Sequence, residues 1–386
     1  MRQCLLVRMI VIFFCGPTLA SAQLVSQDWG YEADGYRIHA KAESMPGLPL
    51  GPFDRLPNGD IITVQGDEST ANAIISQDEG QTWKTIPIFE DSDKYKIRPE
   101  RAMLCTEQGT VIIAFMNDPE RSGWKWDPTL HDSPEAQLPT YVVRSSNGGQ
   151  TWEPPQKLHD AWTGAIRHMI QLSDGKIVFT SQMLLHNPGR HATVTYASDD
   201  EGKTWTQSNI IDLGGMGHHD GAIESTIIER GDGSLWMLLR TNWGRLWQAI
   251  STDGAKTWHP IGPTPIDASA APAILHRLDS GRLFIAWNRY YYDGTEQYPK
   301  AGGDGQWSGT PTSNNRQELS IAFSDDDGQT WSNPVVVATA IPNGQGGYQR
   351  GEISYPYVFE RVPGEIWLTA WRGIGLRVKL FEQDFQ

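Results

Sequence analysis

One eight-residue pattern occurs five times along the chain and limits its fold more than any other sequence feature. Each copy reads Ser-x-Asp/Asn-x-Gly/Ala-x-Thr-Trp, and the copies begin at Ser76, Ser145, Ser198, Ser251 and Ser324. The pattern predicts a tight turn in which the Asp or Asn side chain accepts backbone N–H groups and the glycine takes a positive φ. The closing Trp is expected to pack between neighbouring units. Such repeats indicate one structural unit used several times.

A second set of turns alternates with the first. Short apolar segments are joined in pairs by turns that contain Gly59, Gly109, Gly175, Gly233, Gly281 and Gly364. Each pair predicts a β-hairpin, and each of the first five is followed by a third strand, an eight-residue turn and a fourth strand. The sixth has strands at about 354–361, 365–371 and 375–381, and the stretch 31–42 is expected to supply its fourth strand. The fold class is therefore all-β, a six-bladed β-propeller of four-stranded antiparallel blades.

The first residues have the composition of an export signal. Arg2 and Arg8 precede the apolar run 9–14, and Ala20-Ser-Ala22 offers a cleavage site. Residues 1–22 are thus expected to be a signal peptide and residues 23–386 a single domain. Cleavage would leave Cys105 as the one cysteine, and the chain has no Asn-x-Ser/Thr site. These features predict a bacterial periplasmic or secreted protein.

The charge balance limits the partners. With 32 Lys and Arg against 46 Asp and Glu, the net charge is −14, which argues against nucleic acid. The sequence lacks an apolar run long enough for a membrane span, and it gives no signal for oligomerisation, so a monomer is expected. No cofactor motif occurs, and His218-His-Asp220 lacks the spacing of a zinc site. We expect neither a cofactor nor a metal.

Several charged residues are expected at one mouth of the ring. Alignment of the six innermost strands on their hairpin glycines gives one equivalent slot, which holds Gly51, Arg101, Arg167, Glu224, Ala273 and Tyr355. The second strands end near Asp67, Asn117, Gln182, Arg240, Arg289 and Arg372. Guanidinium groups aimed at a common point suit a carboxylate or sulfate. An acidic oligo- or polysaccharide is therefore the expected partner.

The repeats resemble the Asp-box, or BNR, repeat, and residues 30–386 are similar to the sialidase (neuraminidase) superfamily. In that family the box aspartates are structural. Glu224 in Ala222-Ile-Glu-Ser-Thr resembles the family's glutamate on blade four. The family's nucleophilic tyrosine is matched by Tyr355 in Ile353-Ser-Tyr-Pro-Tyr357. A neutral tyrosine suits a sialoside, because a carboxylate on the anomeric carbon would repel an anionic nucleophile.

The resemblance also implies the anion-binding residues. Arg240 in Met237-Leu-Leu-Arg-Thr241 and Arg316 in Ser313-Asn-Asn-Arg resemble two arginines that bind the substrate carboxylate. The family's third arginine, in an Arg-Ile-Pro motif, has no counterpart in the stretch 48–53. Either Arg101 or Arg167 supplies the third guanidinium, or the substrate is not sialic acid.

Other candidate residues are matched less directly. The family's catalytic acid is matched by Asp67 alone, and Arg289 lies one residue off the slot, so it is either a substrate ligand or a solvated rim charge. His168 and His219 lie near the mouth, where either can act as a general acid or base. The segment 290–315 is expected to fold over the mouth and to offer Tyr291 or Trp307 for sugar stacking.

Three functions remain open at this point. The first is a secreted glycoside hydrolase of exo-α-sialidase type, with Tyr355 as nucleophile and Glu224 as its base. The second is a polysaccharide lyase on uronate polymers, which would use Arg167 with His168, His219 or Tyr355. The third is a non-catalytic propeller that binds acidic glycans, in which Glu224 serves only as an ion-pair partner of Arg240 or Arg167.

Overall fold

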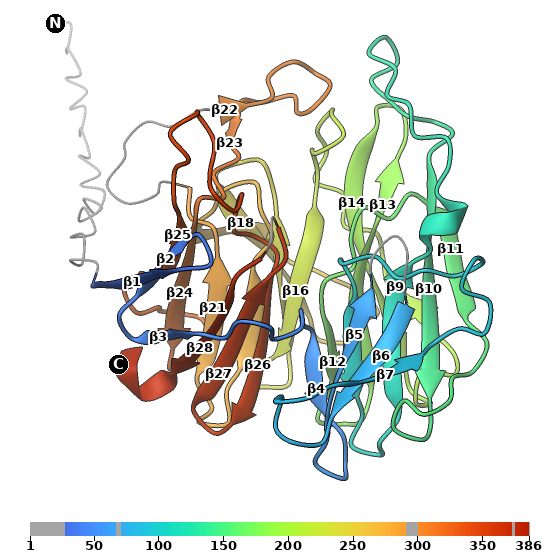
Figure 1. The fold of residues 1–386 in the computed structure, drawn as a ribbon. Helices are drawn as coiled ribbons and strands as arrows, with labels where there is room; N and C mark the ends of the chain where they lie inside the picture. Colours follow the sequence, from blue (N-terminus) through green and yellow to red (C-terminus); the bar gives the residue numbers. More distant parts are fainter. Residues whose placement is uncertain (1–27, 67–70, 291–299, 373–374, 386) are drawn as a thin grey trace, which may run out of the picture.

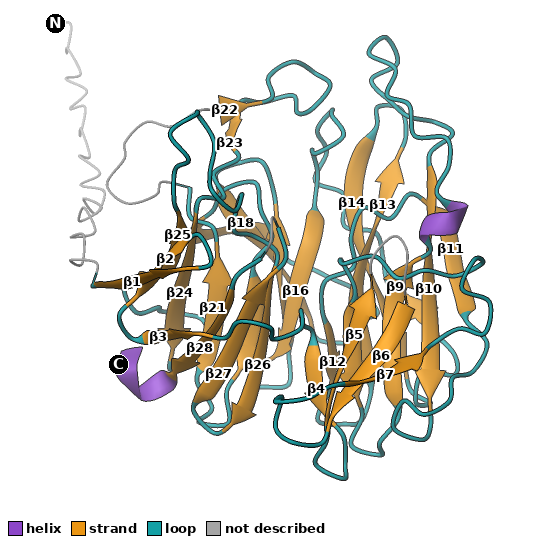
Figure 2. Ribbon diagram, in the orientation of Figure 1, coloured by secondary structure: helices purple, strands orange, loops and turns teal. Residues whose placement is uncertain are grey.

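Six antiparallel sheets stand around a central axis in the computed structural model, which describes residues 28–66, 71–290, 300–372 and 375–385 (Figure 1). The predicted all-β, six-bladed propeller is confirmed. In the part of the chain that the structure describes, the helical segments are two short 3-10 turns, η1 (Asp118–Glu120) and η2 (Glu382–Phe385) (Figure 2). Within the described residues, no helix has the length and apolar character needed to cross a membrane. The signal peptide expected at 1–22 lies outside the described residues and stays a prediction.

The first four blades each use four consecutive strands. Blade one contains β4 (Phe53–Arg55), β5 (Ile61–Gly66), β6 (Ala71–Ser76) and β7 (Lys84–Pro87). Blade two contains β8 (Ala102–Cys105), β9 (Val111–Met116), β10 (Gln137–Ser145) and β11 (Gln156–Ala161). Blade three contains β12 (Met169–Gln171), β13 (Ile177–Leu185), β14 (Arg190–Ser198) and β15 (Thr206–Gln207). Blade four contains β16 (Ile223–Glu229), β17 (Leu235–Arg240), β18 (Arg245–Ser251) and β19 (Ile261–Asp267).

The last two blades include strands from the N-terminal segment. Blade five contains β20 (Ile274–Arg277), β21 (Leu283–Trp287), β24 (Glu318–Ser324) and β25 (Val335–Ala340), with β2 (Tyr36–His39) and β1 (Trp29–Ala33) added at its outer edge. A separate pair, β22 (Lys300–Ala301) and β23 (Thr312–Ser313), lies between β21 and β24 in the sequence. Blade six contains β26 (Pro356–Val362), β27 (Glu365–Ala370), β28 (Arg377–Phe381) and β3 (Ala42–Ser44).

The N-terminal segment closes the ring, but not over the predicted stretch 31–42. The closing strand is β3, which begins where the predicted stretch ends, and most of that stretch forms the β1–β2 hairpin on blade five. The reason is the alternation in β2, where Tyr36 and Ile38 are buried in the same core cluster as Val337 and Ala338 of β25. The buried side chains of β2 alternate along the strand and cover the outer edge of blade five. The three-residue strand β3 is then left to complete blade six.

The eight-residue turns have the predicted geometry. In the first copy, Asp78 accepts hydrogen bonds from the backbone N–H of Thr82 (2.8 Å) and from its hydroxyl (2.6 Å), and Ser76 Oγ accepts from the N–H of Gly80 (2.7 Å). The backbone N–H contacts recur around Asn147, Asp200, Asp253 and Asp326. The carboxylate and amide side chains of these turns are therefore used to hold the turn, which supports a structural role.

The fifth residue of each turn packs against the second strand of the preceding blade. A Cβ placed on Gly80, at φ 87°, would lie 2.5 Å from the buried ring of Trp367 on blade six. The fourth turn carries Ala255 instead, at φ 66°, and a non-glycine residue at this φ is strained. Ala255 belongs to the same buried cluster as Val178. Val178 occupies in blade three the position that Trp367 occupies in blade six. A smaller neighbour thus leaves room for the extra methyl group.

This packing predicts opposite outcomes for two single substitutions. Gly80→Ala should lower the free energy of unfolding by about 1–3 kcal/mol, because its new methyl group overpacks against Trp367 at a positive φ. Ala255→Gly should change it by less than about 1 kcal/mol, because relief of backbone strain offsets the lost methyl burial. Urea unfolding of the two variants beside the unaltered protein measures both. If both substitutions destabilised the protein equally, contact with the preceding blade would not explain why this turn position holds glycine in one blade and alanine in another.

Candidate active site

A tyrosine and a glutamate that lie 131 residues apart in the chain meet at one end of the ring. Tyr355 directly precedes β26 in blade six, and Glu224 is the second residue of β16 in blade four. The Tyr355 hydroxyl donates a hydrogen bond of 2.7 Å to Glu224 Oε1. Both side chains are buried, at 6% and 7% exposure. The structure therefore brings together the two residues that the sequence selects as nucleophile and base.

Both residues have an unusual backbone. Glu224 has φ 47° and Tyr355 has φ 61°, in the left-handed region that non-glycine residues seldom occupy. Strain of this kind costs on the order of 1–3 kcal/mol and persists where the surroundings enforce it. The N–H of Glu224 donates to Gln182 Oε1 (2.9 Å), and Gln182 Nε2 lies 3.3 Å from His191 Nδ1. These buried hydrogen bonds hold the strained peptide of Glu224 and orient its carboxylate toward Tyr355.

Two arginines predicted to bind an anion lie beside this pair. Arg240, at the end of β17, forms a buried ion pair with Glu224. Arg316, which precedes β24, holds its guanidinium 5.4 Å from the Tyr355 ring centroid and donates to the carbonyl of Ala270 (2.8 Å). Arg240 Nε and Nη2 and Arg316 Nε are buried, and no described group accepts a hydrogen bond from them. Buried N–H groups without acceptors are costly, so these atoms are suited to an anionic ligand.

The charges set the protonation states of the pair. Burial acts to raise the pKa of Glu224, but the Arg240 charge, the Tyr355 hydroxyl and the Arg316 charge together hold it below its usual range. Burial, followed by the Glu224 charge, raises the pKa of Tyr355. Burial acts to lower the pKa of Arg240, and the Glu224 charge raises it overall. Glu224 is therefore a carboxylate that can accept a proton, and Tyr355 is a phenol that remains protonated.

Two further guanidinium groups flank Tyr355. Arg167 precedes His168 at the start of blade three, 5.2 Å from the Tyr355 centroid and 4.5 Å from that of Tyr357, and it donates to the carbonyl of Pro356 (2.6 Å). Arg372, after β27, lies 5.9 Å from the Tyr355 centroid and also forms an ion pair with Glu352 (3.4 Å). Blades three to six thus each direct one arginine toward the Tyr355–Glu224 pair.

Two other predicted residues, Arg101 and Arg289, make structural contacts. Arg101 donates to the carbonyls of Gly51 and Pro99, both at 3.1 Å, and to that of Val64, so it connects blades one and two. Arg289 forms a 2.9 Å ion pair with the buried Glu318. Asp67 lies outside the described residues.

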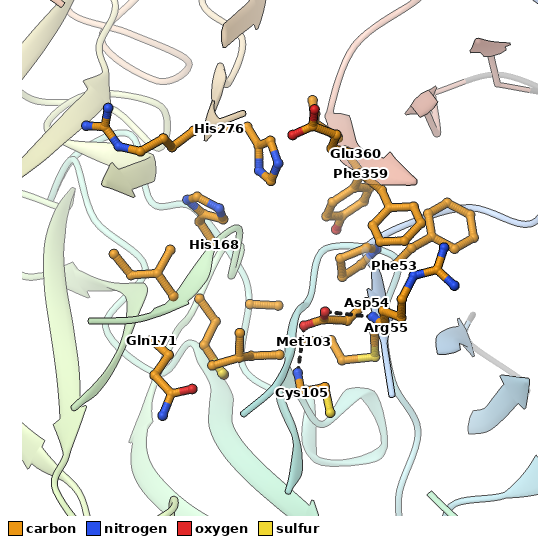
Figure 3. A pocket seen from close by; sticks show the side chains of 18 of the residues that line it. Phe53, Asp54, Arg55, Met103, Cys105, His168, Gln171, His276, Phe359 and Glu360 are labelled. Atoms are coloured by element: carbon orange, nitrogen blue, oxygen red, sulfur yellow. Dashed lines mark hydrogen bonds between the residues drawn. The ribbon is translucent and has the colours of Figure 1, made fainter. Parts of the chain in front are cut away.

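His168 lines a different cavity. A space of about 1020 Å³ runs along the axis and is lined by the innermost strands of all six blades. Figure 3 shows His168 and His276 projecting into it, and Asp54 accepting hydrogen bonds from the N–H groups of Arg55 and Cys105. His168 Nδ1 accepts from the N–H of Ile227 (3.2 Å), and burial lowers its pKa to about 3. These contacts give His168 a structural role as a neutral acceptor.

A pocket of about 180 Å³ contains the candidate active site. It is lined by Glu224, Tyr355, Arg240 and His219, and also by Arg98, Arg121, Trp124, Trp162, Gln182, His191 and His218. Most of the second group is absent from the sequence-based candidates. The available signal was the length of the connection 117–136 between β9 and β10, which supplies Arg121 and Trp124. Arg98 lies three residues before Arg101, where alignment of strand positions selected the residue that points away.

Loops from four blades interlock to form one wall of this pocket. Buried Asp220 accepts hydrogen bonds from the N–H of Gly309 (2.7 Å), the hydroxyl of Ser308 (2.6 Å) and the side chain of Asn242 (3.0 Å). Trp307, from the long segment in blade five, stacks on His219 at a centroid distance of 4.6 Å. The segment 290–315 thus reaches the site as expected, although Tyr291 lies outside the described residues.

Comparison with known proteins supports this reading of the fold. The BNR repeat-like domain family matches residues 75–367. A sialidase of Paraclostridium sordellii is 26% identical over 155 residues, which are 35% of this chain and 37% of the relative, so the match spans little more than a third of that protein. A Hadza microbial sialidase has a TM-score of 0.59 at 17% identity, covering 90% of this chain and 68% of its own. An α-L-arabinanase of Penicillium chrysogenum, complexed with arabinobiose, has a TM-score of 0.53 at 12% identity, covering 90% and 98%.

The buried ion pair predicts a stability defect that depends on pH. In the native protein the depressed pKa of Glu224 contributes stability at neutral pH, which is lost as the pH falls through the folded-state pKa. Arg240→Met should cost about 3–5 kcal/mol at pH 7, because it leaves a buried carboxylate without its main partner. Burial then raises the Glu224 pKa, so protonation at about pH 5 should recover part of the loss.

Urea unfolding at both pH values measures this effect. The double variant Arg240→Met/Glu224→Gln is the control, and it should show no recovery at the lower pH beyond that of the unaltered protein. A loss in Arg240→Met that is the same at both pH values would contradict the assigned coupling.

Proposed function

The chain belongs to the BNR repeat-like domain family, and we propose that it is an exo-acting glycoside hydrolase of sialidase type that removes a terminal acidic sugar. The observation that carries this proposal is the 2.7 Å hydrogen bond from the Tyr355 hydroxyl to Glu224 inside a pocket bordered by arginines. A nucleophile in hydrogen-bond contact with its base is the arrangement that covalent catalysis requires.

The first step forms a glycosyl–tyrosine bond. Tyr355 Oη attacks the anomeric carbon while its proton passes to Glu224 Oε1. The bond from that carbon to the leaving-group oxygen breaks, and a general acid protonates this oxygen. Asp67 is the candidate acid by resemblance. Because Tyr355 stays neutral until it reacts, it does not repel a carboxylate on the anomeric carbon.

The second step hydrolyses the intermediate. Water attacks the anomeric carbon and loses a proton to the conjugate base of the general acid. The bond to Tyr355 Oη breaks, and this oxygen recovers its proton from Glu224. Two displacements at one carbon give net retention of configuration.

The surrounding cations support an acidic substrate. Arg240 and Arg316 have buried N–H groups that lack acceptors, so a sugar carboxylate would satisfy them and orient the anomeric carbon toward Tyr355. The pocket, at about 180 Å³, is smaller than the roughly 300–1,000 Å³ of sites for drug-sized ligands. This size limits the ligand to the end of a glycan chain and therefore favours exo cleavage. The proposal includes export, as expected from residues 1–22.

The lyase alternative receives less support. It needs a basic side chain to remove a proton, and His168 lines the axial cavity rather than the pocket. His219 does line the pocket, where burial, followed by the Arg240 charge, lowers its pKa. No described histidine is in hydrogen-bond contact with Tyr355 or Glu224, whereas these two contact each other.

Substitution of Tyr355 tests the proposal. Tyr355→Phe should lower kcat by at least about 10³-fold, because removal of the nucleophile leaves only binding and electrostatic stabilisation. The assay follows release of free sialic acid from an aryl sialoside. Tyr357→Phe is the matched control, since its hydroxyl donates to the backbone carbonyl of Pro99 (2.8 Å) and lies outside the pocket lining. It should retain most of the activity.

Two other outcomes would identify the alternatives. An ultraviolet-absorbing unsaturated product from a uronate polymer, without release of sialic acid, would establish a lyase. Tight binding of acidic glycans without turnover, unchanged by Glu224→Ala, would establish a non-catalytic propeller.

A further inference from the structure

Aromatic rings form a continuous row along the wall of the pocket. Trp162 and Trp124 lie 4.4 Å apart between ring centroids, and Trp124 contacts His218 edge-on at 5.9 Å. His218 lies 4.2 Å from His219, which stacks on Trp307. All five rings are partly exposed. Aromatic rings of this kind can pack against the apolar side of sugar rings.

Separate loops carry this row above one end of the ring. Trp124 comes from the β9–β10 connection and Trp307 from the segment between β22 and β23, and both segments rise at the same end in Figure 1. Buried carboxylates hold the loops in place. Asp132 accepts from the N–H of Asn187 (3.1 Å) and contacts the His186 ring (2.9 Å), and Asp220 holds the blade-five segment. The row is therefore fixed before a ligand binds, which lowers the entropic cost of binding.

One arginine at the Trp162 end has no carboxylate partner. Arg121 is exposed and lines the pocket, and its guanidinium lies 5.6 Å from the Trp162 ring centroid. No carboxylate in the described part of the chain forms an ion pair with it, although acidic residues outnumber basic ones by 46 to 32. Its neighbour Arg98 differs, because it donates to Asp118 at 2.5 Å. Contact with the indole face orients the Arg121 fork while leaving its N–H groups available.

We propose that Arg121 and the Trp124–Trp162 pair form a second subsite, which binds an acidic sugar unit adjoining the terminal acidic sugar. The tryptophan faces receive the sugar ring, and Arg121 binds its carboxylate. This subsite extends the proposed function by assigning a substrate class, namely glycans with two consecutive acidic units at the chain end. Arg121, Trp124 and Trp162 line the same pocket as Tyr355 and Arg240.

The test compares two sialosides that differ in the neighbouring unit. Sialyllactose has a neutral neighbour, whereas α2,8-linked disialic acid has an acidic one. Arg121→Gln should raise KM for disialic acid about tenfold, change KM for sialyllactose less than about twofold, and leave kcat for both unchanged. Arg37→Gln is the matched control, because it removes an exposed charge from β2 at the outer edge of blade five. It should change neither KM.

Each result separates the subsite from the proposed function. An equal rise in KM for both substrates, or no rise for disialic acid, would overturn the subsite and leave the hydrolase proposal standing.

If the unaltered protein cleaves neither substrate, the hydrolase proposal fails. The subsite is then tested by measuring how tightly acidic oligosaccharides bind. In tryptophan fluorescence titrations, a galacturonate tetrasaccharide should then bind about tenfold more weakly to Arg121→Gln, and its carboxyl-reduced counterpart equally to both. Equal binding of the acidic form to both proteins would overturn the subsite.

Discussion

The site depends on one buried carboxylate that is shared between two blades. Glu224 on blade four accepts a hydrogen bond from the Tyr355 hydroxyl on blade six and forms an ion pair with Arg240. A buried charge costs several kcal/mol unless such partners compensate it. Arg240 lies on the same blade as Glu224, whereas Tyr355 lies 131 residues away, directly before β26 of blade six. Blades four and six must therefore both be in place before the three groups meet.

The same pair shows how the fold stores local strain where it is used. Glu224 and Tyr355 both have positive φ, and Gln182 receives the Glu224 N–H that this backbone presents. Other described non-glycine residues, such as Ala255, also have positive φ, but of all these residues only Glu224 and Tyr355 line the pocket. Asp220 holds the loop wall next to His219, which lines the same pocket as Glu224 and Tyr355.

The sequence predicts the architecture well because the architecture is repeated. Five copies of one turn and six hairpin glycines fix the number of blades, whereas the closing strand has no such repeat, and its position was misjudged by several residues. Resemblance located Tyr355, Glu224, Arg240 and Arg316. Alignment of strand positions did not locate Arg98, because Arg98 lies in the irregular segment before β8, three residues before the aligned Arg101. The positive φ of Glu224 and Tyr355 is imposed by tertiary contacts and leaves no signal in residue type. The length of a connection such as 117–136 indicates that the loop has a structural or functional role, but it does not show which of its side chains reach the pocket.

The central claim is that Tyr355 carries the sugar during the reaction. A fluorinated sialosyl fluoride slows the second step more than the first, so the intermediate should accumulate and survive proteolysis. Peptide mass spectrometry should then find one sugar adduct on the peptide that contains Tyr355, and none on that peptide from Tyr355→Phe. A protein that releases sialic acid from an aryl sialoside but carries no adduct there, or carries it on another residue, would contradict the account.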